Sequence, residues 1–558
     1  MAVAATGGWT DPVSVTIGPA GGLHWACDAL SALFALVLCV VGAAAALEGG
    51  ALRLPVAIWA MILMPFAADG FTLALCFGVA GVASRPGMEQ AACGVLCLVA
   101  AMALLAPPGA APDLRFAAMR VASPEGAKAT AILFLALLGA ASQLAWPAAQ
   151  ATVQTEPVGA LLPGGMAVAT LYVLIRVLLD LCGPATPGWW AVPLLVLGAG
   201  AAVLGGLRAN AEDDLLAILD ASRMGAAGLA VAGLGATLAA RDADAPALAA
   251  LALGGVLLHV VGYALVDALL ALCAAAVMRG AGTRALSRLG GLIRSMPGTT
   301  LGAMAGAASL ASLPLTVGFA GRWLVLQSLL ALPEVCGIWQ QAGIAAVLAA
   351  VALGIALAAA AAVRLVGIGF LGRPRTPRTA AAEETSRRVR LGVAGLAGLC
   401  ALLGVWPSLA LLLIRPAVAR LLDVDLAGRL LVVPAQANGP GYAAPGIAAL
   451  LALCGVLLAS IARGRAGQDG QRVPAWDGGL DEPPPWLPFG DPASQYSAAS
   501  ASQALLQSLG YPGPRQARLQ GMRQWAVKAA SRLRRPGIGG PAGLLLLLVI
   551  AMLLWGAW

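Results

Sequence analysis

The sequence predicts an all-α polytopic membrane protein, and three observations support this fold class. Of the 558 residues, 60% are hydrophobic and only 11% are charged, against roughly 25% charged residues in an ordinary soluble domain. The mean hydropathy is +0.87. Apolar runs of about 20 residues, the length that crosses the hydrocarbon core of a bilayer, recur along the chain. Because a soluble fold needs a polar surface, this composition excludes a soluble enzyme.

The apolar runs define about 14 transmembrane helices, separated by short polar or Pro- and Gly-containing segments. The run 71–84 is too short to count as a span by itself. In chain order, the expected helices cover residues 29–48, 51–70, 71–84, 90–106, 127–147, 158–182, 188–207, 215–240, 246–278, 298–313, 317–332, 341–370, 390–414, 441–462 and 542–558.

The composition also divides the chain into segments. Residues 1–22 are expected to form an extramembrane segment, because they lack the basic start and apolar core of a cleavable signal. Residues 23–463 form the transmembrane domain. Residues 464–541 are polar and rich in Pro and Arg, which predicts a basic cytoplasmic segment with an interfacial helix near its end. This segment is interpreted either as a docking surface for a protein partner or as a solvated linker before the last helix, 542–558.

Arginine-rich loops predict the orientation in the membrane. The loops 373–390 and 463–535 are separated by two spans, so they face the same side, and the positive-inside rule makes that side cytoplasmic. The basic loop 279–294 lies on the opposite side if three spans follow it. It lies on the same side if Pro314 only interrupts one long helix.

The chain offers few ligands for cofactors. Its two histidines, His24 and His259, exclude a cytochrome with several bis-histidine haems. The ten cysteines are dispersed, and the nearest pair, Cys93 and Cys97, has no second pair to complete a zinc or iron–sulfur site. We therefore expect no cofactor and no metal on this chain. The net charge of +8 is explained by arginines in loops, so no nucleic-acid partner is expected.

Ionisable groups inside apolar spans are candidates for an ion path, because an ionised side chain at mid-bilayer costs at least ~2.5 kcal/mol. Arg176 and Asp180 are four residues apart on one helix, so they form either a simple ion pair or part of such a path. The candidate residues for the path are Asp69, Arg176, Asp180, Asp220, His259, Tyr263, Asp267 and Arg364.

The row formed by His259, Tyr263 and Asp267 has the spacing i, i+4, i+8, which places all three on one helical face. His259 and Asp267 are then about 12 Å apart along the axis, too far for a direct hydrogen bond. With Tyr263 or a water between them, the row would suit a proton path; the alternative is a packed polar seam. Within span 158–182, the motif Pro163-Gly164-Gly165 predicts a broken helix of the kind that forms midplane ion sites.

Several short motifs together resemble a known family. Each is weak alone, but their order and spacing are informative. They are Cys27-Asp28, Tyr172–Arg176, Leu289–Pro297, Leu313-Pro314, Phe370–Arg375, Trp406-Pro407 and Trp476–Gly479. The chain resembles, along nearly its whole length, the antiporter-like proton-translocating membrane subunits of respiratory complex I, multisubunit sodium/proton antiporters and membrane-bound hydrogenases. Within that family it is most similar to the large component B of hydrogenase-4 and formate hydrogenlyase type complexes.

The resemblance implies a fold of inverted five-helix repeats with broken helices, in which Glu, Lys and His side chains pass protons along the midplane. It also implies partners: other membrane subunits, and iron–sulfur, hydrogenase-like or quinone-reductase-like peripheral subunits. The chain would then be a non-redox subunit of an oxidoreductase complex, without a catalytic centre of its own. Such a complex lies in the inner (cytoplasmic) membrane of a prokaryote.

The sequence departs from the family pattern at its relay positions. The family's glutamate, its broken-helix lysine, its next lysine and its late-helix lysine correspond here to Phe77-Gly78, Val168, Asp267 and Arg364. Arginine stays charged at physiological pH, so it relays protons less readily than lysine. The N-terminal half thus loses its relay, whereas the C-terminal half keeps His259, Asp267 and Arg364.

Three functional hypotheses follow. The first is an ion-translocating subunit that uses a modified path through Asp267 and His259. The second is an ion-inactive scaffold subunit of the same kind of complex. The third is a stand-alone or two-component transporter for a cation or inorganic carbon, whose cation site would be formed by the adjacent carboxylates Glu212, Asp213 and Asp214.

Overall fold

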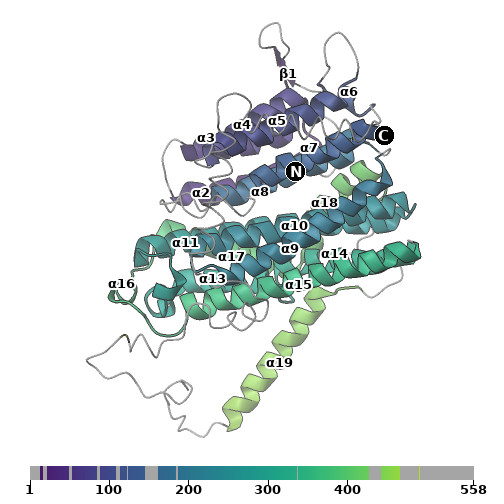
Figure 1. Cartoon of the computed structure of the whole chain (residues 1–558). Coiled ribbons are helices and arrows are strands. Elements are labelled where there is room, and N and C mark those ends of the chain that lie inside the picture. Colours follow the sequence, from purple (N-terminus) through teal and green to yellow (C-terminus); the bar gives the residue numbers. More distant parts are fainter. Residues whose placement is uncertain are drawn as a thin grey trace.

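Helices make up nearly all of the described chain, as Figure 1 shows. In this computed structural model, the described residues are 13–16, 22–48, 53–84, 88–107, 114–121, 124–144, 161–183, 186–335, 337–426, 441–465 and 489. One small antiparallel hairpin pairs β1 (Val13–Thr16) with β2 (Gly22–Trp25), with Val13 opposite Trp25. The sequence predictions for 466–541, apart from residue 489, and for helix 542–558 fall outside these residues.

Twelve of the described helices are apolar enough for a membrane environment, nine of them at full spanning length and three shorter. The predicted all-α, multi-pass fold is therefore confirmed. In chain order the helices are α2 (Ala29–Glu48), α3 (Arg53–Leu63), α4 (Gly70–Ser84), α5 (Met88–Leu105), α6 (Phe116–Met119), α7 (Gly126–Gln143), α8 (Leu162–Ile175), α9 (Ala191–Ala211), α10 (Leu215–Asp242), α11 (Pro246–Ala281), α12 (Leu292–Ser295), α13 (Pro297–Leu310), α14 (Val317–Ala331), α15 (Ile338–Gly369), α16 (Pro377–Ala380), α17 (Arg387–Val405), α18 (Pro407–Leu422) and α19 (Ala444–Arg465).

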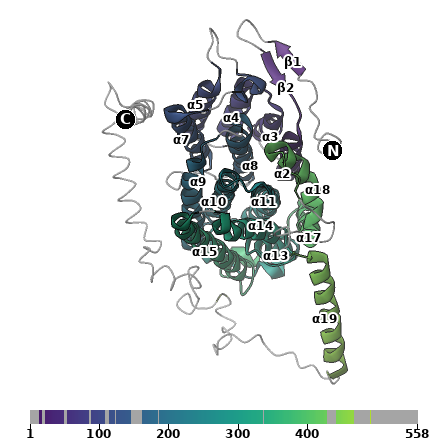
Figure 2. The same cartoon turned by 90° about the vertical axis from the view of Figure 1, so that its right-hand side faces the viewer.

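Helix α11 is the central element of the bundle. It is 36 residues long and buried on all sides over most of its length, as expected of a helix that is apolar around its whole circumference. It packs against α2, α10, α13, α14, α17 and α18. Figure 2, in which many helices are seen close to end-on, shows α11 inside this ring of neighbours. Polar groups in the buried stretch of α11, such as His259 and Asp267, are therefore held inside the protein and away from lipid.

Helices α13 and α14 are two halves of one interrupted span. At Gly302 a Cβ atom would lie near Cys273 in the C-terminal half of α11, whereas at Gly321 it would lie 2.4 Å from the backbone of His259, nearer the middle of α11. The two halves are thus stacked along α11. Between them, Ser312 and Leu315 have positive φ angles of 59° and 67°, a conformation that breaks a helix.

This interruption settles the position of the basic loop 279–294. Because α13 and α14 form one span, the loop lies at the same end of the bundle as the loop 373–390. The two loops are joined directly: Gly291 N–H donates to Leu371 O at 2.9 Å, and Ile293 N–H donates to Phe370 O at 2.9 Å. Of the two predicted alternatives, the same-side arrangement is correct.

A second interruption separates α17 from α18 at Trp406-Pro407, so the predicted single helix 390–414 is wrong at its centre. Pro407 begins α18, where its missing N–H costs nothing. A Cβ atom at Gly404 would lie 2.3 Å from the Leu315 carbonyl oxygen. The breaks in the two interrupted spans are therefore in contact.

Two other predicted spans differ from the structure. The span 51–70 ends early, because α3 stops at Leu63 and a 3₁₀ turn over Met64–Phe66 contains Pro65. In the span 158–182, Pro163 and its two glycines form the first turn of α8. The irregularity lies instead at Arg176–Leu181, which is π-helical, a local widening often found at functional positions.

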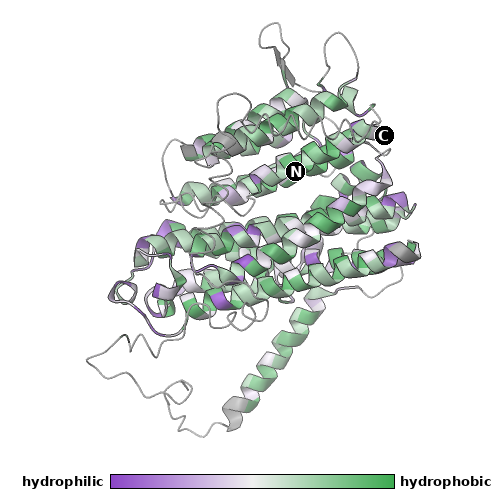
Figure 3. Ribbon diagram, viewed as in Figure 1, coloured by the Kyte–Doolittle hydropathy of each residue, from purple (hydrophilic) through white to green (hydrophobic). Residues whose placement is uncertain are grey.

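The outer surface of the bundle is apolar. Figure 3 shows hydrophobic residues along the helices and hydrophilic residues gathered mainly at the helix ends, including the loops around α16. Helix α19 projects from the bundle in both cartoon views, and nearly all of its residues up to Ile461 are exposed. This surface fits a hydrocarbon environment.

Candidate ion path

A cluster of three charges, of which Arg223 and Asp267 are buried and Asp220 is partly buried, lies between α10 and α11. Arg223 donates through Nε to Asp267 Oδ1 at 2.8 Å and through Nη1 to Asp220 Oδ1 at 2.5 Å. Arg223 and Asp267 are 5% and 3% exposed. Both carboxylates are predicted from the sequence. Arg223 is not, although its position three residues after Asp220 is the spacing of a helical ion pair.

The first turn of α8 is shaped around this cluster. A Cβ atom at Gly164 would lie 1.7 Å from Asp267 Oδ2, so the carboxylate occupies the space that any side chain would need. The N-terminus of a helix carries a partial positive charge, which stabilises a nearby anion. The Pro-Gly-Gly motif thus serves to admit Asp267, although it does not break the helix as predicted.

His259 and Tyr263 continue the polar row along α11. His259 Nε2 lies 3.0 Å from Ala226 O on α10, and the rings of His259 and Tyr263 have centroids 6.1 Å apart. Together with Asp267, they form the predicted row on one face of α11, directed at α10 and α14. Asp267 interacts most closely with Arg223 and not with Tyr263.

Arg322 of α14 is a second buried arginine near this row. It donates through Nη1 to Leu310 O at 2.7 Å and to Ser312 Oγ, so it bridges the break between α13 and α14. It is close enough to act electrostatically on His259 and Tyr263. The sequence predictions do not include it, although a charge within a predicted span is itself a signal of function.

A cavity of about 20 Å³ adjoins Arg322, and Ser222 and Ala226 also line it. Arg322 Nε is buried and has no hydrogen-bond partner within the described part of the chain. A cavity holds a water when it offers about 10–15 Å³ and polar partners. The cavity beside Arg322 has room for one water.

Arg176 and Asp180 belong to a separate cluster at the far end of α8. Arg176 Nη1 lies 2.6 Å from Asp28 Oδ2 and 2.8 Å from Asp180 Oδ2, and Arg120 binds Asp180 with both Nε and Nη2. Tyr172 Oη accepts from Arg176 and donates to Pro65 O. The predicted Arg176–Asp180 ion pair is confirmed, within a four-residue network of two arginines and two aspartates.

Asp28 lies just before α2, where it accepts from Ser31 N–H at 2.7 Å. Burial opposes its ionisation, but the charge of Arg176 and the hydrogen bonds from Arg176 and Ser31 outweigh burial, so the pKa of the Asp28 carboxyl lies well below its usual range. Asp28 is therefore a fixed anion at neutral pH. This network pins α2 to α8 and is not suited to proton transfer at that pH.

The other two candidate residues cap helices. Asp69 accepts from Thr72 N–H at 2.7 Å and from His24 N–H at 2.9 Å, so it lies in the turn before α4 and not within a span as predicted. Arg364 donates to Ala209 O at 3.0 Å and to Asn210 O at 2.5 Å at the C-terminus of α9. Neither side chain is placed beside the polar row on α11.

The three adjacent carboxylates after α9 are also engaged. Asp214 caps α10 through Leu216 N–H and pairs with Arg284 at 2.5 Å. Asp213 accepts from Ser287, and Glu212 pairs with Arg208 at 3.2 Å. No group of three possible metal ligands occurs among the residues that the structure describes.

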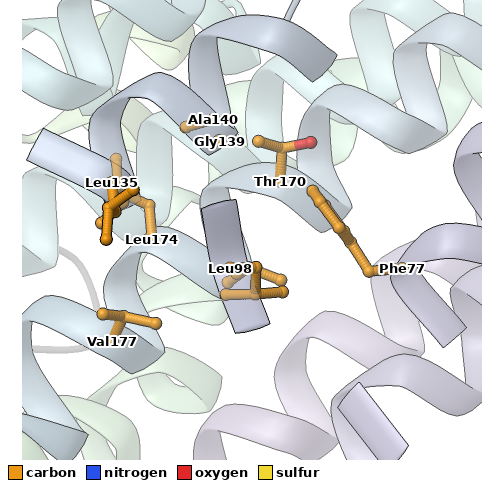
Figure 4. A pocket seen from close by; sticks show the side chains of 10 residues that line it. Phe77, Leu98, Leu135, Gly139, Ala140, Thr170, Leu174 and Val177 are labelled. Carbon is orange, nitrogen blue, oxygen red and sulfur yellow. The ribbon is translucent and has the colours of Figure 1, made fainter. Parts of the chain in front are cut away.

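The N-terminal half has an apolar interior where the family relay is expected. Figure 4 shows a cavity lined by Phe77, Leu98, Leu135, Leu174 and Val177, among others, and its volume is about 10 Å³. Its one hydroxyl, that of Thr170, donates to its own helix at Met166 O. Small apolar cavities stay dry, so this region offers no stable water for a proton path.

Comparison with known proteins identifies the family. Residues 90–349 match the family model described as NADH:quinone oxidoreductase/Mrp antiporter, transmembrane. The chain is 31% identical over 458 residues to an uncharacterised protein of Mycobacterium tuberculosis, covering 74% of this chain and 68% of that one. The chain belongs to this antiporter-like membrane family, which confirms the predicted resemblance.

Two further comparisons report similar proteins. Hydrogenase-4 component B of Escherichia coli is 29% identical over 305 residues, which cover 53% of this chain and 45% of that one. A chain of the membrane-bound sulfane sulfur reductase, an archaeal respiratory membrane complex, has a TM-score of 0.73 at 18% identity, covering 98% of this chain and 92% of that one. The latter similarity shows a shared fold.

The Arg176 network predicts a large and specific loss of stability. Arg176→Gln leaves Asp28 buried without its cation, which costs about 3–5 kcal/mol. We expect a clear drop in the thermal unfolding midpoint of the detergent-purified protein, measured by size-exclusion chromatography after heating. The double variant Arg176→Gln/Asp28→Asn should recover part of this loss, because no unpaired charge remains.

Arg415→Gln is the matched control, since Arg415 forms an exposed ion pair with Asp425 and such pairs contribute below about 1 kcal/mol. If Arg176→Gln and Arg415→Gln unfold at the same temperature, the network does not hold α2 to α8.

Proposed function

We propose that this chain is the antiporter-like membrane subunit of a complex I-like or hydrogenase-4-like respiratory complex, and that it moves protons through its C-terminal half. The observation that carries the proposal is the buried Arg223–Asp267 ion pair, with the partly buried Asp220 beside it and the first turn of α8 against Asp267. Charged groups at this depth are costly and in general mark ion pathways.

The residues on the path have distinct tasks. Asp220 and Asp267 share one arginine, so a proton on either carboxylate leaves Arg223 paired with the other. Tyr263 and neutral His259 each carry a group that can both donate and accept a proton. A water in the cavity beside Arg322 would extend the row toward the break between α13 and α14.

The two arginines, Arg223 and Arg322, supply fixed positive charge along the path and do not release protons. The charges of Arg223 and Arg322 balance those of the two aspartates. With His259 neutral, the region therefore has no net charge. A proton arriving on an aspartate creates one excess positive charge, which favours its onward movement. Arg364, which caps α9, takes a positioning role in this proposal, as do Asp69, Arg176 and Asp180.

The fold fits the inverted five-helix repeats of the family. Each half contains one irregular span that carries buried charge: the π-helical end of α8 in the N-terminal half and the interrupted α13–α14 span in the C-terminal half. In this proposal, residues 23–463 form the transmembrane domain. The loops 279–294 and 373–390 face the cytoplasm of a prokaryotic cell, by the positive-inside rule.

A scaffold role without ion movement is the second candidate, and the dry cavity around Phe77 favours it for the N-terminal half. An independent transporter with a cation site at residues 212–214 has less support, because Asp213, Asp214 and Glu212 each bind a neighbour. Redox centres of the complex would lie on partner chains.

Purification of the chain from its native membrane in mild detergent tests the assignment to a complex. We expect it to copurify with other membrane subunits and with iron–sulfur, hydrogenase-like or quinone-reductase-like subunits, identified by mass spectrometry. Recovery of the chain alone, with intact ion transport in vesicles, would contradict the assignment and support the transporter.

Asp267→Asn in the purified complex tests the path. The amide cannot become an anion, so we expect proton uptake into vesicles to fall at least tenfold, while Asp220 keeps Arg223 paired and the complex assembled. Asp425→Asn, at the exposed ion pair with Arg415 of α18, is the control and should transport normally. Unchanged proton uptake in Asp267→Asn would contradict the proposed path. Absence of proton uptake in the unaltered complex would favour the scaffold role.

A further inference from the structure

The basic end of the bundle carries more positive charge than its own carboxylates balance. At the starts of α13 and α17, the exposed arginines are Arg294, Arg387, Arg388 and Arg390. None of these four has an ion-pair partner in the described part of the chain. The nearby Glu384 is engaged in capping α13, where it accepts from Gly298 N–H and Thr299 Oγ1. These arginines therefore have guanidinium groups available for an anionic partner.

Helix α17, which begins at Arg387, carries a stripe of exposed apolar residues on the same face as Arg387. Leu391 follows Arg387 by one turn and is 63% exposed, and Leu402, further along the same side, is 46% exposed. The residues at the spacing i, i+4, i+8 lie on one face of a helix. From Arg387 to Leu402 the stripe is about 22 Å long, enough to cross one leaflet of a hydrocarbon core about 30 Å thick.

Two glycines leave open space in the middle of this stripe. Gly395 and Gly398 lie between Leu391 and Leu402, and a Cβ atom at either would meet nothing within 4 Å. On the adjacent helix α13, which packs beside α17 (Figure 2), Leu301 is 64% exposed one turn after Pro297. Apolar surface thus begins directly below the arginines on both helices.

From this arrangement we infer that the α13–α17 edge, defined by Arg294, Arg387, Arg390, Leu301 and Leu391, binds an anionic phospholipid. Arginine binds phosphate with two parallel hydrogen bonds, and the exposed apolar stripe along α17 packs against an acyl chain. An acidic protein would match the charges but would leave the apolar stripe without a matching contact. A phospholipid matches both the arginines, through its phosphate, and the apolar stripe, through its acyl chain. This inference does not depend on proton movement.

The test compares lipid retention by the full-length protein in detergent. The protein is exchanged into micelles containing phosphatidylglycerol or phosphatidylcholine, washed, and analysed for bound lipid by native mass spectrometry. We expect phosphatidylglycerol to be retained in preference to phosphatidylcholine. The variant Arg387→Gln/Arg390→Gln should lower the affinity for phosphatidylglycerol about thirtyfold, because each basic residue at the surface contributes about a factor of five.

The variant Arg415→Gln/Arg420→Gln, which removes two arginines from α18, is the matched control and should retain phosphatidylglycerol. Equal retention by all three proteins, or equal losses in both variants, would overturn the site. Displacement of the lipid by inorganic phosphate alone would show an anion site that makes no use of the apolar stripe, and would overturn the lipid assignment. An acidic polypeptide that copurifies from native membranes and is lost only from Arg387→Gln/Arg390→Gln, with lipid retention unchanged, would replace the lipid by a protein partner.

Discussion

The cost of holding an ionised side chain in hydrocarbon governs the interior of this protein. Three of the buried arginines offset that cost with several partners: Arg176 and Arg223 each bind two aspartates, and Arg364 binds carbonyl groups that end a helix. Removal of a single partner would leave a charge that neither water nor lipid stabilises. The helices that carry these groups are therefore fixed relative to one another, and α8 is held at both ends.

One of the helix breaks lies beside a cavity that can hold a water molecule. The breaks at residues 311–316 and at Trp406 are in contact, and Arg322 satisfies carbonyl and hydroxyl groups at the first of them. A cavity large enough for one water adjoins Arg322, and Ser222 is the other polar side chain that lines it. The corresponding region of the N-terminal half is filled by Phe77 and aliphatic side chains. The two halves of the molecule thus share a helical framework but differ in their cavities, since a charged side chain lines the one beside Arg322 and none lines the one beside Phe77.

Much of the fold could be predicted from the sequence, because apolar runs of membrane-spanning length are unambiguous and the row at 259, 263 and 267 follows from helical spacing. The partners of these residues could not be predicted. Asp267 is bound by Arg223 from a different helix, and Arg364 meets the end of α9, which spacing along one helix does not reveal. The break predicted at Pro163-Gly164-Gly165 is wrong, because a proline and two glycines suit a helix start as well as a helix break.

Hydroxyl-radical footprinting of the purified complex tests most directly whether only the C-terminal half is hydrated. Radicals formed from bound water modify side chains next to that water, and tyrosine, histidine and phenylalanine all react and can be assigned by mass spectrometry. Tyr263 and His259 should be modified, whereas Phe77, which is 1% exposed, should stay protected. Modification of Phe77 to the same extent, or complete protection of Tyr263 and His259, would contradict the account.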